Sequence, residues 1–163
     1  MFGGIALKKI FLFLGLAAAL GLSACGGTHG TTQAAPQQPA ATQNTAYKAT
    51  LNVNGHKLPV TLRNEPSAAD LYSRLPVTLE FKDFSGMEKI AYFDKRLNEN
   101  DQHVGCHPLA GDICVYQPWG NLSIFYVDFK DDPNLIPIGR LESGLDIIKA
   151  QKNNFTATLE KAE

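Results

Sequence analysis

The side chains best suited to bind a metal lie between positions 101 and 112. His103, Cys106 and His107 stand there between two aspartates, and zinc or copper accepts all of these ligand types. Their spacing matches no standard metal motif, and Cys106 lacks the preceding cysteine of a haem attachment site. Glycine and proline also keep the two histidines off a shared helix face. We therefore predict a solvated polar loop here and no metal.

Aromatic side chains suited to an apolar ligand are found around a Pro-Trp-Gly-Asn turn at residues 118–121. Tyrosine and tryptophan combine apolar area with a polar tip, so they are frequent at binding sites. The alternative is core packing for the aromatic residues and an ion pair for the arginine. We predict five candidate ligand-binding residues: Trp119, Tyr116, Tyr126, Tyr92 and Arg140.

Other patterns that carry chemistry are missing from the sequence. There is no Ser/His/Asp order, no phosphate-binding glycine loop and no HExxH motif. We therefore predict no catalytic residue and no cofactor.

The elements that must position these side chains are mostly strands. Apolar and polar residues alternate along 47–53 and 58–62, and Asn54-Gly55 between them is the strongest short hairpin signal. Similar patterns predict strands at 77–81, 89–93, 135–141 and 155–159. The runs 113–116 and 122–127 flank the Pro-Trp-Gly-Asn turn and predict a central hairpin buried on both faces.

Two short helices complete the pattern, one over 68–75 with Ser67 as its N-cap and one over 144–150 with Ser143 as its N-cap. A long polar loop is expected over 98–109. About eight strands with two short helices predict a mainly β protein. We expect a closed barrel, because closure removes exposed strand edges.

The N-terminal segment has the layout of a secretory signal. The predicted signal covers residues 1–24: residues 2–22 are apolar apart from Lys8 and Lys9, and Leu-Ser-Ala precedes Cys25. This ending resembles the lipobox of bacterial lipoproteins, which implies cleavage before Cys25 and lipidation of its sulfur. The alternative is an uncleaved membrane-spanning helix. Several acyl chains would hold the chain on a membrane without spanning it.

The segment after the signal, residues 25–46, is predicted to be a flexible tether, because it holds no large apolar residue and no Asp, Glu, Lys or Arg. The folded domain is then 47–163. Loss of Lys8 and Lys9 leaves thirteen basic and sixteen acidic residues, a net charge of −3. That balance argues against nucleic acid as a partner.

Cys106 and Cys114 form the remaining cysteine pair. An even pair in an exported domain favours a disulfide, and the proline and glycine between them let the chain bend. The alternative is two free thiols, one of them packed in a strand.

The domain resembles the bacterial cyclophilin-like proteins. The resemblance rests on Gly-Asp-Ile at 111–113, Pro-Trp-Gly-Asn at 118–121, Ile-Phe-Tyr at 124–126 and Ile-Gly-Arg at 138–140. It implies a closed cyclophilin-like barrel, often carried by a secreted or lipid-anchored chain. True cyclophilins are prolyl isomerases with a Phe-His-Arg catalytic segment, which this sequence lacks. Arg96 is the nearest basic residue, in a different context.

Three hypotheses follow. The first is a non-catalytic module of the bacterial envelope that binds a small ligand or a peptide. The second is a divergent prolyl isomerase acting on exported proteins, and the third is a structural envelope protein. The lipid anchor predicts the outer membrane facing the periplasm if the cell is Gram-negative, because Gly26 rather than Asp follows Cys25.

Overall fold

A computed structural model describes residues 46–163. The predicted signal over 1–24, the lipidation site Cys25 and nearly all of the tether lie outside the described residues. Eight strands and two helices follow in chain order: β1 Tyr47–Val53, β2 His56–Leu62, α1 Pro66–Ser73, β3 Val77–Phe84, β4 Glu88–Tyr92, β5 Asp112–Tyr116, β6 Asn121–Phe125, β7 Leu135–Leu141, α2 Leu145–Ala150 and β8 Phe155–Lys161.

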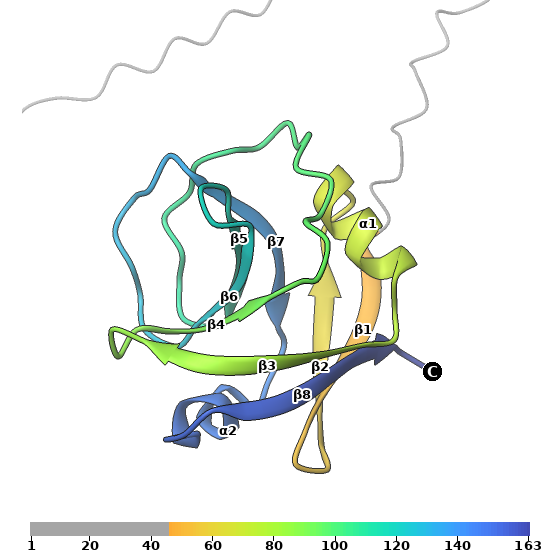
Figure 1. The fold of residues 1–163 in the computed structure, drawn as a ribbon, viewed down its shortest axis with the longest axis vertical. Helices are drawn as coiled ribbons and strands as arrows, with labels where there is room; N and C mark the ends of the chain where they lie inside the picture. The colour runs from red at the N-terminus through yellow and green to blue at the C-terminus, as the bar shows by residue number, and fades with distance from the viewer. Residues whose placement is uncertain (1–45) are drawn as a thin grey trace, which may run out of the picture. The chain divides into compact units, whose positions relative to one another are not determined.

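The strands form one closed antiparallel barrel in the order β1-β2-β7-β5-β6-β4-β3-β8, and β8 pairs with β1 to close it (Figure 1). The predicted mainly β barrel is confirmed. Asn54 and Gly55 have φ of 50° and 84°, as the tight turn between β1 and β2 requires. Closure leaves every strand with two neighbours, so no edge is left to pair with another chain.

Alternate residues of the strands fill the barrel interior. Leu51, Phe81 and Ile124 come from three different strands and are each at most 3% exposed. Their side chains share one apolar core with Ala68 and Leu71 of α1, both fully buried. Figure 1 shows α1 and α2 near opposite ends of the barrel. Neither helix of the described region is long and apolar enough to cross a membrane.

Both predicted helix caps are wrong. Helix α1 begins at Pro66 and its N-cap residue is Glu65, because proline's fixed φ suits the first helical position. The Ser67 hydroxyl donates instead to Asp101 Oδ1 at 2.7 Å. Helix α2 has Gly144 as its N-cap residue, at a φ of 80°, and not Ser143.

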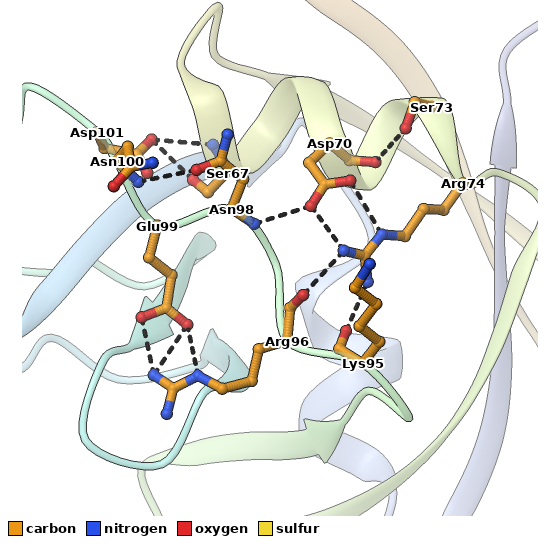
Figure 2. A network of polar contacts seen from close by, with 10 residues as sticks. All are labelled: Ser67, Asp70, Ser73, Arg74, Lys95, Arg96, Asn98, Glu99, Asn100 and Asp101. Carbon is orange, nitrogen blue, oxygen red and sulfur yellow. Dashed lines mark hydrogen bonds and ion pairs between the residues drawn. The ribbon is translucent and has the colours of Figure 1, made fainter.

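A long irregular segment between β4 and β5 is tied to α1, as Figure 2 shows. The Asp70 carboxylate accepts hydrogen bonds from the Arg74 guanidinium at 2.6 and 3.0 Å and from the Asn98 amide at 2.8 Å. Arg74 also donates to the carbonyl oxygens of Lys95 and Arg96 at 2.5 and 2.8 Å. This network sets the path of the segment that later passes over the outside of β5.

Candidate functional site

The two faces of strand β6 are buried by different parts of the molecule. Leu122 and Ile124 belong to the barrel core, so Asn121, Ser123 and Phe125 face outward, because successive side chains of a strand alternate. All five residues are nonetheless buried. The predicted burial of this strand on both faces is therefore confirmed, although β6 ends at Phe125 rather than at residue 127.

Two loops lie side by side near the outer face of β5 and β6. Cys106 and Asp132 exchange backbone hydrogen bonds of 3.2 and 3.0 Å, which pairs the loop before β5 with the loop before β7. The Phe129 amide donates to the Pro108 carbonyl at 2.9 Å. These contacts hold the two loops together, and a hollow lies between the loop before β7 and the sheet.

That hollow is a cavity of about 250 Å³. It is bounded by the ends of β3, β4, β5 and β7, by the outer face of β6 and by the loop before β7. Ten residues line it: Phe84, Glu88, Tyr116, Trp119, Asn121, Ser123, Phe125, Phe129, Asp132 and Leu135.

Aromatic rings make up half of this lining. Trp119 meets Phe84 and Tyr116 edge to face, with ring centroids 5.5 and 5.3 Å apart. Phe125 and Phe129 pack at 5.5 Å with their planes tilted by 32°. Trp119 stays 49% exposed, so the cavity opens to solvent beside it. Such rings offer apolar area together with electron-rich faces.

The polar side chains of the lining are mostly hydrogen-bond acceptors. Burial raises the pKa of the Glu88 carboxyl, the nearby Asp132 charge raises it further, and the Ser123 hydroxyl counteracts part of the shift. Glu88 Oε2 and Asn121 Oδ1 are buried and have no hydrogen-bond partner. An unpaired buried acceptor is costly, so a ligand that brought a donor to either oxygen would relieve that cost.

A short hydrogen-bond chain orients the Asn121 amide. Asn121 Nδ2 donates to Ser123 Oγ at 2.9 Å and more weakly to the Leu122 carbonyl at 3.4 Å. The Ser123 oxygen thereby acts as an acceptor, and its own proton is left for the Glu88 carboxyl. Asn121 Oδ1 is consequently the end of this hydrogen-bond chain that lacks a donor.

The cysteine pair lies next to the cavity. Cys114 packs with Phe125 and Leu135, and Cys106 borders the same cluster. Both are free thiols with their sulfur atoms 4.0 Å apart, so the predicted disulfide is not formed in this structure. The hydrogen bond between them lowers the pKa of Cys106, and that bond together with burial raises the pKa of Cys114.

The structure brings two of the five predicted ligand-binding residues, Trp119 and Tyr116, into this cavity. Tyr126 lies elsewhere, where its hydroxyl donates to Asp83 Oδ1 at 2.5 Å. Tyr92 is 48% exposed, and its ring lies 5.6 Å from the Lys82 ammonium.

Arg140 is also outside the cavity lining. It forms an ion pair with Asp112 and donates to the Ala110 carbonyl at 2.8 Å. Asp112 is thus the strand carboxylate that pairs with Arg140.

No sequence pattern indicated the four polar residues of the lining. Glu88, Asn121, Ser123 and Asp132 lie on two strands and a loop, and no motif links them. A signal existed only on β6, where polar Asn121 and Ser123 alternate with leucine and isoleucine. This alternation is short and lies beside apolar residues, so it resembles a strand that is apolar on both faces.

The histidine-containing segment does not form a ligand cluster. His103 Nδ1 lies 2.5 Å from Glu65 Oε1, and His107 Nδ1 lies 3.8 Å from Asp131 Oδ1. Within residues 46–163, no three His, Cys, Asp or Glu side chains are arranged to hold a metal ion.

Comparison with known proteins identifies the family. A solved hypothetical protein from Archaeoglobus fulgidus is similar in fold, with a TM-score of 0.59 and 13% identity over 75% of this chain and 99% of that one. No curated protein matches the sequence. Residues 51–160, well over half of the sequence, match the Cyclophilin-like family. The chain therefore belongs to the Cyclophilin-like family.

Proposed function

We propose that this domain is a binding module that holds a small ligand or a peptide segment in the cavity beside Trp119. One observation carries the proposal: a cavity of about 250 Å³ combines five aromatic walls with buried acceptors that lack partners. Apolar surroundings with a few convergent polar groups are the usual make-up of a ligand site.

Trp119 provides the test, because it is the only tryptophan of the chain and lines the cavity. Metabolites and short peptides would be titrated into the full chain while its fluorescence is recorded. A ligand of this cavity should change the signal saturably, and Tyr116→Ala should weaken its binding. Tyr92→Ala is the matched control, since Tyr92 is an exposed aromatic residue outside the cavity. A flat response to every compound would favour a structural role.

The alternative function is a prolyl isomerase, which needs a donor aimed at the prolyl amide nitrogen. The ten lining residues, all within the described part of the chain, include no Arg, Lys or His. Arg96 pairs with Glu99 at 2.8 Å and packs on the turn that precedes β6. A protease-coupled isomerisation assay tests this alternative. Activity well above the uncatalysed rate that is lost in Arg96→Lys or Arg140→Lys would replace binding with catalysis as the main function.

The membrane anchor is part of the proposal and rests on the sequence. The Leu-Ser-Ala-Cys25 ending supports lipidation, which would place the binding module at the bacterial envelope surface. Cys25→Ala should move the chain from the membrane fraction to the soluble fraction. Mass spectrometry of the N-terminal peptide should show acyl chains on Cys25, and an unmodified peptide beginning before it would contradict the anchor.

A further inference from the structure

The chemistry of the cavity's polar groups restricts what it can bind. Glu88 and Asp132 bring two carboxyl groups to one cavity, and the Asp132 charge acts on Glu88. Their repulsion in a partly dry site is relieved by a positive charge between them. Two carboxyl groups alone do not establish a cation-binding site, so a further polar group of the cavity is needed as evidence.

Asn121 supplies an independent indication. This residue is 1% exposed, lines the cavity and leaves its Oδ1 without a donor. Nδ2 donates to Ser123 Oγ, and turning the amide to present a donor would require the Ser123 proton that goes to the Glu88 carboxyl. The buried end of the cavity therefore favours a ligand whose N–H groups donate hydrogen bonds there. Tyr116 and Trp119 carry neutral donors, which remain for a ligand's more exposed part.

The aromatic walls agree with this requirement. A cation is attracted to the electron-rich face of an aromatic ring within about 6 Å of its centre. The same protein already makes such a contact elsewhere, where the Lys89 ammonium lies 5.0 Å from the centre of the Tyr126 ring. Phe84, Tyr116 and Trp119 form a connected set of rings along one side of the cavity.

Resting on the proposed binding function, we infer that the cavity takes an alkylammonium or guanidinium group, with its N–H groups on Glu88 and Asn121 and its apolar stem among the rings. Such a group occurs in free amines and in the lysine and arginine side chains of peptides. The shared chemistry is a cationic donor on an apolar stem, and a volume of about 250 Å³ suits a single group of that size.

Matched probes test the inference by Trp119 fluorescence on the full chain. Pentylammonium, butylguanidinium, pentanol and pentanoate share a similar stem and differ in the charge of the polar end. We expect the cations to bind roughly tenfold or more tightly than pentanol, in line with a charged hydrogen bond, and pentanoate to bind weakest. Equal binding of pentanol or pentanoate would overturn the cationic class and leave the binding function standing. No saturable response to any of the four probes would also overturn the cationic class, and the titration with metabolites and peptides would then decide on the binding function separately.

Variants confirm where the cation lies. Glu88→Gln keeps the side-chain shape, so it should abolish the preference for ammonium over pentanol while pentanol affinity stays the same. Glu80→Gln removes the same charge from an exposed position on β3 outside the cavity and should leave the preference unchanged. An unchanged preference in folded Glu88→Gln, verified by circular dichroism, would refute the assignment. A lysine-containing tripeptide that binds as tightly as pentylammonium would assign the natural ligand to a protein, and binding of the free amine alone would assign it to a small molecule.

Discussion

The buried Lys89–Asp83 pair yields a quantitative stability prediction. The Lys89 side chain is 3% exposed, and its ammonium donates to Asp83 Oδ1 and to the Gln151 carbonyl, both at 2.7 Å. Asp83 is 38% exposed on its side chain, so water solvates it even without Lys89. The two partners therefore differ in what their removal leaves behind.

Asp83→Asn should be the costly change. Removing one partner of a buried pair costs about 3–5 kcal/mol when the remaining charge has no compensation. In this variant Lys89 still contacts the Gln151 carbonyl and the Tyr126 ring, and position 83 is partly solvated. We therefore expect the free energy of unfolding to fall by about 2 kcal/mol. Such a loss lowers the melting temperature by roughly 8 °C for a domain of this size.

Lys89→Met should change stability by less than about 1 kcal/mol, because it removes the charge whose burial is unfavourable and keeps most of the apolar stem. Urea unfolding of the full chain, followed by circular dichroism, gives both free energies of unfolding. The double variant should be more stable than Asp83→Asn alone. A Lys89→Met loss equal to or larger than that of Asp83→Asn would refute the reasoning, because the attraction would then outweigh desolvation.

The same pair has a pH signature. The hydrogen bond from Lys89, followed by that from Tyr126, lowers the pKa of Asp83. A carboxyl whose pKa is lower in the folded state stabilises the fold above its unfolded pKa of about 4, and this contribution is lost as pH falls through the folded value. Asp83→Asn should abolish that part of the acid-induced loss of stability.

Three further predictions concern single residues. Burial, with the hydrogen bond to Asp83, raises the pKa of Tyr126 to about 12, so an ultraviolet titration should show one late tyrosine that titrates earlier in Asp83→Asn. Gly139→Ala should destabilise the barrel by about 1–3 kcal/mol in urea unfolding, because its Cβ would stand 2.7 Å from a carbonyl oxygen of β2, and wild-type stability would contradict this. Cys106 is a partly exposed free thiol whose pKa is lowered by the hydrogen bond to Cys114, so it should be alkylated in the native chain well before the fully buried Cys114, and equal labelling rates would contradict this.

The strands were predictable because their signals are local. Alternation along 47–53 and the Asn54-Gly55 turn specify a hairpin within fifteen residues or so, and the structure has both. The helix caps were not predictable by the same means. Ser67 has a capping side chain, but Pro66 starts the helix one residue earlier and Asp101, far along the chain, takes the hydroxyl.

The residues of the cavity likewise fall into those that the sequence could place and those that it could not. Trp119 and Tyr116 belong to one hairpin, so the sequence was sufficient to place them together. Glu88 and Asp132 come from a strand and a loop that share no motif, and only the closed barrel brings them to one space. Arg140 has the residue type of a ligand contact, but its strand directs it to Asp112.

The sequence by itself determined a mainly β chain, its turns and an aromatic hairpin, because side-chain alternation and turn chemistry act over a few neighbouring residues. Only the tertiary structure decided that the outward face of β6 is a cavity floor. The sequence indicated that this face is buried, but the loops near it are joined by backbone pairing of Cys106 with Asp132, and a contact between such distant segments leaves no periodic trace in the sequence.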